Sequence, residues 1–462
     1  MTPPPVYFLK NFVDGGAIER GCETLHKLCF VQQSRSCASP PFPRNFPGIT
    51  FMSASAETSA ASRWDIVTVA MMVGILAGMQ IGKVAPALPV LRTDLDLDLV
   101  TAGWVASLFT LAGACGGALI GASADRIGPR RAARFSLLML AIGSLWGGFS
   151  SSLIEIMLSR SVESLGFIGT AVSCPRLIVG AVAPKDRNLA LGIWGTFVPG
   201  GMTIAMLMAP IAMPAIGWRG IWILNGCLAL AMIGVLAWKT RNASWTPPDA
   251  AAAPIPPLQG LMRCVSQVGP WLLALTFFAY SMQYLSVTAW MPSFLIDARG
   301  LEYETANYFA AIVVAANMIG NVLAGILLAR GMTRQTVLLA AFIGMAICAA
   351  GLYGPWLETG PRIVSAFLFS AIGGLIPGAL MAATPVHAPA TNLVGVVNGL
   401  MMQGSNIGAL TGPPLIAGIV TLSGGWHGAT WHALIFCVVG SLGALLLGWR
   451  ERKTARFDTH QA

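Results

Sequence analysis

Four polar residues stand in two apolar stretches that are each long enough to cross a bilayer. Arg160 and Glu163 lie three positions apart in the stretch 153–180, so they share one face of a helix. Gln80 and Lys83, in the stretch 66–90, have the same spacing. Counting the helical rise from the ends of each stretch places all four at similar heights in the membrane. Because an ionisable side chain inside a membrane span is costly, this pattern predicts a functional polar site.

The balance of charge at this site indicates which solutes it could bind. Lys83 and Arg160 supply two positive charges and Glu163 supplies one negative charge, so the cluster is net positive when all are ionised. Arginine pairs well with planar carboxylates and similar anions, which favours a small anionic or polar solute. Glu163 is the candidate proton-coupling residue, although the sequence leaves coupling open. The alternative is a buried ion triad with a purely structural role.

A second polar group lies in the stretch 270–292. Tyr280, Gln283 and Tyr284 are spaced by three and four residues, which predicts that they share a helix face at about mid-depth. We expect them to form the opposing wall of the solute site. Packing between helices is the alternative explanation for the two tyrosines.

The composition shows what kind of scaffold must position these residues. Hydrophobic residues make up 55% of the 462 residues and charged residues only 10%, against about 25% charged in a soluble domain. The nine cysteines form no metal-binding or redox motif. We therefore expect an integral membrane protein with no cofactor, no metal site and no disulfide framework. Its partners would be a small-molecule solute and membrane lipids, with no nucleic acid, and we expect a monomer.

The apolar stretches predict an all-α membrane protein with twelve transmembrane helices. Each stretch approaches or exceeds the roughly 20 residues needed to cross the hydrocarbon layer. The predicted spans are 66–90, 99–122, 132–150, 153–180, 188–214, 220–238, 270–292, 305–328, 335–354, 363–383, 394–420 and 431–449. The predicted organisation is an N-terminal extension 1–62, a six-helix bundle 63–238, a cytoplasmic linker 239–268, a second six-helix bundle 269–450 and a cytoplasmic tail 451–462.

The loop charges predict the orientation of the chain. Lysine and arginine gather in alternate loops and in the tail, whereas the opposite loops are mostly acidic. Under the positive-inside rule, both termini therefore lie in the cytoplasm of a bacterial inner-membrane protein. The polar segment 1–62 has no secretory signal pattern. The residues from Met52 onward read like an ordinary start of a bacterial membrane protein, which predicts that residues 1–51 are not translated. The alternative is that residues 1–51 form a disordered cytoplasmic tail.

The loop after the second predicted span contains a recognisable motif. It reads Gly121-x-x-x-Asp125-Arg126-x-Gly128-Pro-Arg130 and resembles the Gly-x-x-x-Asp-Arg-x-Gly-Arg-Arg signature of the major facilitator superfamily. A weaker copy, with Gly, Arg and Arg at equal spacing, lies 204 residues later. The resemblance extends over about 65–450. Within the family, the segments 80–86 and 163–167 resemble the branch of cyanate and nitroimidazole porters.

The resemblance implies a fold and a set of roles. It implies two pseudo-symmetric six-helix bundles, the major facilitator fold, which moves a solute by alternating access as a symporter or antiporter. The loop residues Gly121, Asp125, Arg126, Gly128 and Arg130 would act as a conformational latch. Asp125 would interact with a helix N-terminus and with Arg130. The alternative is that the arginines only fix topology.

Other classes of protein fit the sequence less well. The chain has no motif for a hydrolase, a metalloprotease, a P-loop or a dinucleotide site, so we expect neither an enzyme nor an ATP-driven pump. A multidrug or metabolite efflux pump of the same fold is the main rival, although its cavity would more often be acidic than basic. A non-transporting receptor or sensor is a remote alternative.

Overall fold

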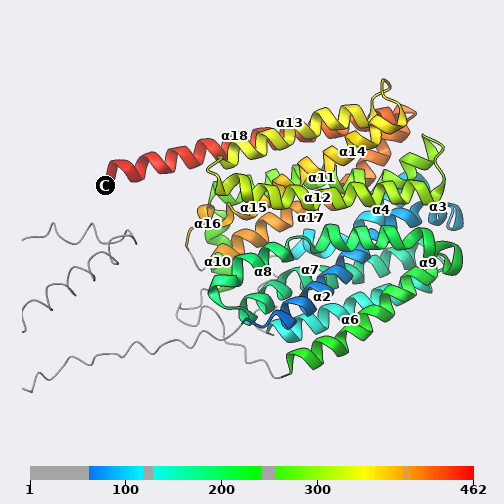
Figure 1. Cartoon of the computed structure of the whole chain (residues 1–462), viewed down its shortest axis with the longest axis horizontal. Helices are drawn as coiled ribbons and strands as arrows, with labels where there is room; N and C mark the ends of the chain where they lie inside the picture. Colours follow the sequence, from blue (N-terminus) through cyan, green and yellow to red (C-terminus); the bar gives the residue numbers. More distant parts are fainter. Residues whose placement is uncertain (1–61, 118–127, 242–255, 391–392, 462) are drawn as a thin grey trace, which may run out of the picture. The chain divides into compact units, whose positions relative to one another are not determined.

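The computed structural model describes residues 62–117, 128–241, 256–390 and 393–461, and the described residues form helices without any strand (Figure 1). The first part of the chain contains α2 (Trp64–Gly82), α3 (Val84–Asp94), α4 (Leu99–Ser107), the 3₁₀ turn η1 (Leu108–Thr110), α6 (Pro129–Gly148), α7 (Leu153–Ala181), α8 (Arg187–Trp194) and α9 (Phe197–Thr240). The second part contains α10 (Pro257–Val265), α11 (Val268–Asp297), α12 (Tyr303–Ala329), α13 (Arg334–Tyr353), α14 (Thr359–Gly373), α15 (Leu375–Met381), α16 (Thr384–His387), α17 (Val394–Ser423) and α18 (Ala429–Gln461).

Ten helical stretches of the described residues are long and apolar enough to cross a membrane. One of them, Leu189–Thr240, has 52 residues and would be about 78 Å long as a straight helix, well over twice the roughly 30 Å hydrocarbon layer. It is interrupted at Gly217, whose φ of 65° and ψ of 178° are not helical. The 20-residue α6 is not among the ten, and it carries three arginines near its start. The count of twelve spans therefore stays a prediction.

Local sequence signals explain where several of these helices begin. Ser152 caps α7, because its hydroxyl accepts from the Glu155 amide while the Glu155 carboxylate accepts from the Ser152 amide. This pair separates α6 from α7, where the sequence has only a short serine-rich turn. Before α6, Gly128 adopts a φ of 86°, which favours glycine, and Pro129 occupies the first helical turn.

The first membrane stretch is broken in its middle, at Lys83. α2 ends at Gly82 and α3 begins at Val84, so Lys83 lies at the joint. Pro86 explains the break, since proline has no amide hydrogen to bond the carbonyl four residues earlier and its ring crowds that carbonyl. A helix break of this kind leaves backbone carbonyls accessible to side-chain donors.

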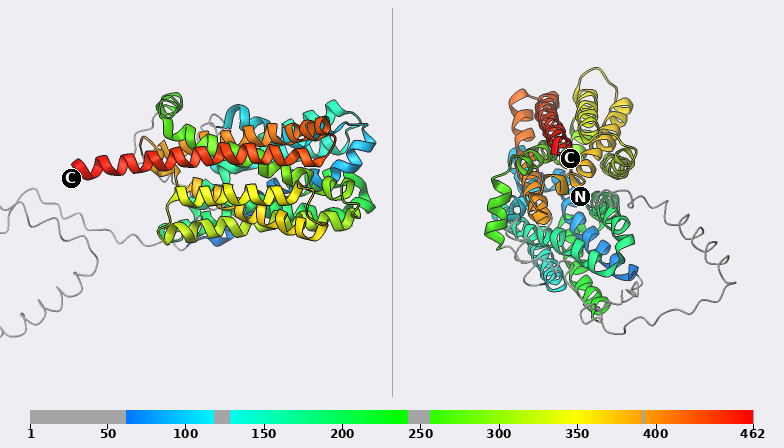
Figure 2. Two further views of the ribbon diagram at one scale, coloured as in Figure 1. Left: turned by 90° about the horizontal axis from the view of Figure 1, so that it is seen from above. Right: turned by 90° about the vertical axis from the view of Figure 1, so that its left-hand side faces the viewer.

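The helices of each part pack mainly with one another, and the main contacts between the parts are α4–α17, α9–α12, α3–α11 and η1–α17. α2, α6, α7 and α9 pack together, and so do α11, α13, α14, α17 and α18. Between the parts, α4 packs on α17, α9 on α12 and α3 on α11, and the end-on view in Figure 2 shows orange α17 beside the blue and cyan helices. Gln403 of α17 donates to the Ala114 carbonyl at 3.0 Å, so side chains also bridge this interface.

Several predicted features lie outside the described residues. These are the N-terminal extension up to residue 61 with Met52, residues 242–255 of the linker and three of the five latch residues. The latch residues concerned are Gly121, Asp125 and Arg126. Gly128 and Arg130 are described and stand at the start of α6. The latch therefore stays a prediction.

Candidate functional site

The structure brings Gln80, Lys83, Arg160 and Glu163 together in one buried cluster. Glu163 accepts from Lys83 through Oε1 at 2.7 Å and pairs with Arg160 through Oε2. Lys83 also donates to the side-chain oxygen of Gln80. The Lys83, Arg160 and Glu163 side chains are 0% exposed, so this carboxylate is the main compensation for two buried cations.

Lys83 also contacts two other helices of the first part of the chain, α6 and α9. Its ammonium group donates to the Ser144 hydroxyl of α6 at 2.7 Å and lies 4.4 Å from the ring centre of Trp222 on α9. Ser144 in turn donates to the Trp222 carbonyl at 2.7 Å. The Lys83 backbone keeps helical dihedral angles, with φ −64° and ψ −23°, so its side chain leaves the same helix face as Gln80 and points toward α6 and α9.

Arg160 contacts the other side of the cluster. Its Nη1 donates to the Gln80 carbonyl at 2.9 Å and its Nε donates to the Val105 carbonyl at 3.3 Å. The guanidinium lies 4.7 Å from the ring centre of Phe109. Among the described residues nothing accepts a hydrogen bond from its Nη2, which is buried. An unpaired donor on a buried cation is costly unless a ligand or water completes it.

Close packing holds the carboxylate in place. A methyl group at Gly143 of α6 would lie 2.7 Å from the Cγ of Glu163, so only glycine fits opposite this side chain. Gly166, one turn further along α7, is equally tight against the Ser136 carbonyl of α6. These glycines bring α6 and α7 close together, which is a common device where helices pack in a bilayer.

The side chains of Tyr280, Gln283 and Tyr284 do not all contact the same neighbouring helix. Tyr280 and Tyr284 stack with ring centres 5.3 Å apart, and the Tyr280 hydroxyl accepts from Asn317 of α12 at 2.9 Å. Gln283 turns toward α18, where its side-chain oxygen accepts from the Cys437 thiol at 3.0 Å. The structure thus separates Gln283 from the tyrosine pair, and all three are buried within the second part of the chain.

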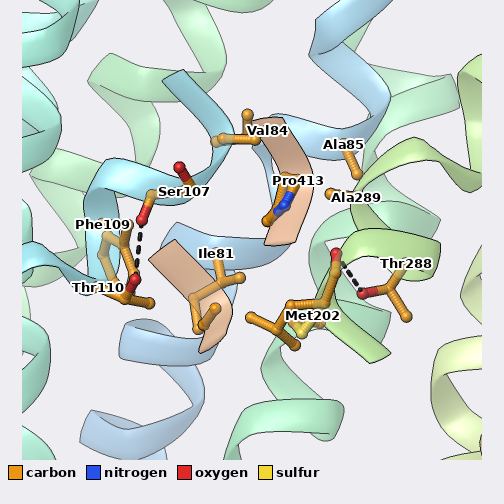
Figure 3. Close-up of a pocket in the computed structure, with 13 residues that line it drawn as sticks. Ile81, Val84, Ala85, Ser107, Phe109, Thr110, Met202, Thr288, Ala289 and Pro413 are labelled. Carbon is orange, nitrogen blue, oxygen red and sulfur yellow. Dashed lines mark hydrogen bonds between the residues drawn. The ribbon is translucent and has the colours of Figure 1, made fainter. Parts of the chain in front are cut away.

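A narrow cavity with a volume of about 20 Å³, room for about one water molecule, lies between the two parts (Figure 3). Residues of both parts line it. They are Ile81, Val84, Ala85, Ala106, Ser107, Phe109, Thr110 and Met202 from the first part and Leu285, Thr288, Ala289, Ala409 and Pro413 from the second. The predicted polar residues are not in this wall. Phe109 belongs both to the wall and to the surroundings of Arg160, so it connects the cavity with the buried cluster.

Comparison with known proteins places this arrangement in a family. The sequence profile of the Major Facilitator Superfamily matches residues 70–413. The chain belongs to this superfamily. Membership confirms the prediction of a membrane transporter that is not an enzyme. The finer assignment to the cyanate and nitroimidazole branch stays a prediction.

Individual relatives agree with this assignment. Over 406 residues the chain is 23% identical to the probable sulfoacetate transporter of Cupriavidus necator, covering 82% of this chain and 91% of that protein. It is 22% identical over 398 residues to the hexuronate transporter of Bacillus subtilis, covering 82% and 93%. A solved bacterial homolog of the human lysosomal transporter Spinster, inward-facing and occupied, superposes with a TM-score of 0.67 at 16% identity, covering 85% of this chain and 97% of that one. This likeness shows a shared fold.

Three residues of the transporter's site carry no signal in the sequence. Ser144, Trp222 and Phe109 complete the surroundings of Lys83 and Arg160, yet serine and aromatic residues are common in membrane helices. The ionisable residues stand out because they are rare there. Their neutral partners can be identified only once the helices are placed side by side.

Proposed function

We propose that this chain is a secondary active transporter that moves a small anionic solute across a bacterial inner membrane by alternating access. The observation that carries the proposal is Arg160, a buried cation with an unpaired Nη2 beside a cavity between the two parts of the chain. The cluster holds two cations for one carboxylate, so an anion would complete its charge. The names of the relatives support an anionic solute, since sulfoacetate and hexuronate are both anions.

Alternating access further requires a particular topology, which we include in the proposal. Gly217 divides Leu189–Thr240 into two arms, and α6 is long enough for another crossing. Together with the nine other stretches these give twelve crossings in two six-helix bundles, with both termini in the cytoplasm. The contacts α4–α17, η1–α17, α9–α12 and α3–α11 are then the surfaces that must separate and re-form during transport.

Glu163 is the proposed coupling residue. It holds Lys83 and Arg160 together, so adding a proton to it would weaken both ion pairs and leave the cations free for an anion. Binding of the anion and binding of the proton would therefore favour each other, which is the linkage that a symporter needs. In proteoliposomes, Glu163→Gln should retain solute exchange and lose accumulation driven by a pH gradient. Accumulation by this variant at the normal level would exclude Glu163 as the coupling site.

An efflux pump for apolar compounds is the second candidate. The observation that favours it is the cavity wall, in which ten of the thirteen residues are apolar. In such a pump the Arg160 cluster would serve only to hold the helices of the first part together.

Ligand-induced thermal stabilisation of the purified protein separates the two candidates. We would compare small organic anions with lipophilic cations, since a ligand at 100 times its Kd stabilises by about 2.7 kcal/mol. Arg160→Lys should abolish the effect of anions, because lysine keeps the charge but lacks the forked donors. Arg362→Lys is the matched control, since Arg362 is also buried and donates to backbone carbonyls, at Leu357 and Leu352. Stabilisation by cations alone would favour the efflux pump.

A further inference from the structure

The guanidinium of Arg160 lies directly behind the wall of the cavity. Its Nε donates to the Val105 carbonyl, and the next residue, Ala106, lines the cavity. Its Nη1 donates to the Gln80 carbonyl, and the next residue, Ile81, also lines the cavity. The ring of Phe109 lies over the guanidinium and is itself part of the wall. The guanidinium, with its unpaired Nη2, is thus separated from the cavity by the Phe109 ring.

The wall offers little else to a polar solute. Its three hydroxyl groups donate their protons to backbone carbonyls of their own segments. Figure 3 shows the bond from Thr110 to Ser107 and a second bond of Thr288, to the Leu285 carbonyl at 3.3 Å. Thr110 donates to Ser107 at 2.9 Å, Ser107 to Trp104 at 3.3 Å and Thr288 to Tyr284 at 2.9 Å. These hydroxyls therefore present only lone pairs to the cavity. The remaining lining residues are apolar, so hydrogen-bond donors for a solute come from behind the wall.

We propose that the transported solute is an organic monoanion with an apolar body, either alkyl or aromatic. Its anionic group would bind Nη2 of Arg160 and its body would lie among Phe109, Leu285 and Ala289. The inference rests on the proposed function of an anion transporter and specifies its substrate class. A sugar acid would bury several hydroxyl groups against apolar side chains without partners, which is costly. An inorganic anion such as nitrate would gain nothing from the apolar wall.

In this scheme the Phe109 ring must move before the solute can bind Arg160. In the present conformation Arg160 is fully buried and the cavity has a volume of only about 20 Å³, so the solute enters and its anionic group reaches Nη2 only when the Phe109 ring turns aside and the wall opens. Phe109 belongs to the short 3₁₀ turn η1, which interrupts the helix between α4 and the residues that follow. A 3₁₀ turn inside a longer helix often marks a hinge, which gives this ring a means to move. Once displaced, the ring contacts the apolar body and discriminates between solutes.

The test measures affinity for a graded panel of anions, using thermal stabilisation of the purified full chain. The panel contains acetate, butanoate, hexanoate, benzoate, glucuronate and nitrate. Each methylene that becomes buried should raise affinity about fourfold, so hexanoate should bind far more tightly than acetate. Benzoate should bind more tightly than glucuronate, which has a similar ring size but is covered with hydroxyls.

Two variants locate the apolar body in this cavity. Ala289→Leu adds bulk to the wall and should shift the preference from hexanoate toward butanoate, a change that a purely structural effect would not produce. Phe109→Leu should reduce the advantage of benzoate over butanoate about tenfold. Phe167→Leu is the matched control, because Phe167 packs 4.8 Å from the Phe109 ring but does not line the cavity. It should leave the order of affinities unchanged.

The outcomes distinguish this inference from the proposed function. Affinity that rises with chain length in the wild-type protein, with the preference shifted from hexanoate toward butanoate in Ala289→Leu, supports both. If glucuronate or nitrate binds as tightly as hexanoate and benzoate, the apolar-body inference is wrong and the anion transporter stands. If no anion stabilises the wild-type protein and lipophilic cations do, the proposed function itself fails.

Discussion

The balance of charge in the buried cluster leads to a sharp prediction about stability. Removing the carboxylate by Glu163→Gln leaves two fully buried cations without a counter-ion, a loss typically worth about 3–5 kcal/mol. Removing Lys83 by Lys83→Met instead leaves Arg160 and Glu163 as a balanced pair. Ser144 then keeps its bond to the Trp222 carbonyl, so the main losses are the hydrogen bonds from Lys83 to Glu163 and Gln80, each about 1–3 kcal/mol, and no buried charge is left unbalanced.

The double variant Lys83→Met/Glu163→Gln makes the test stronger. It leaves Arg160 as the only charge of the cluster, so it should be more stable than Glu163→Gln alone although it carries one more substitution. Such a sign of coupling is expected for residues in direct contact and not for distant ones. Because membrane proteins often unfold irreversibly, the unfolding temperatures should be compared at one scan rate in one detergent.

Glu304→Gln at the start of α12 is the matched control, since Glu304 is exposed and its replacement should leave the unfolding temperature unchanged. The reasoning is refuted if Lys83→Met unfolds at the same temperature as Glu163→Gln or below it. It is also refuted if the double variant is less stable than both single ones. In that case the cluster is not held together by the balance of its charges.

Three further predictions concern how the two parts of the chain meet and how the first span is shaped. Gly103→Ala puts a methyl group 2.8 Å from a backbone carbon of α17, and this overpacking costs about 1–3 kcal/mol, so it should populate the conformation in which α4 and α17 are apart. Gly116→Ala is the control, because a methyl group there meets open space and should leave the populations unchanged. Distances between spin labels on α4 and α17 would show the difference. Arg92→Ala removes a 3.5 Å ion pair with Asp297 between α3 and α11. Such partly exposed pairs contribute about 0.2–1 kcal/mol, so the ratio of separated to packed conformations should change at most about fivefold, and less at high salt. The same spin-label distances would measure this ratio. Pro86→Ala should restore an amide that can bond the Gly82 carbonyl and so change the bend between α2 and α3. Uptake in proteoliposomes should then fall while thermal stability is kept, and normal uptake would contradict a role for the interruption.

The fold can be anticipated from the sequence because the bilayer imposes length and polarity on every span. Charged residues are scarce in the chain, so the few that lie inside apolar stretches point to the cluster by their positions alone. The contacts among Gln80, Lys83, Arg160 and Glu163 show that estimates of depth along two helices are sufficient to bring these residues together. Their role in binding and coupling stays a prediction.

The direction of individual side chains cannot be anticipated in the same way. Spacing by three and four residues places Tyr280, Gln283 and Tyr284 within one broad face, yet this face meets α12 on one side and α18 on the other. Gln283 consequently bonds to Cys437, whereas Tyr280 bonds to Asn317. Sequence spacing gives the angle between residues on a helix, and only the neighbouring helices decide which partner each one meets.

The cavity is the feature least accessible to sequence analysis, and it is also the one that bears most on specificity. Its wall consists largely of alanine, proline and other apolar residues that are indistinguishable from lipid-facing ones in the sequence. A charged cluster alone would bind any small anion, and an apolar cavity alone would suit a drug exporter. Because Phe109 belongs to both, charge and apolar surface would act on the same solute in the scheme we propose. Selectivity in this protein should therefore depend on the side chains between Arg160 and the cavity more than on the arginine itself.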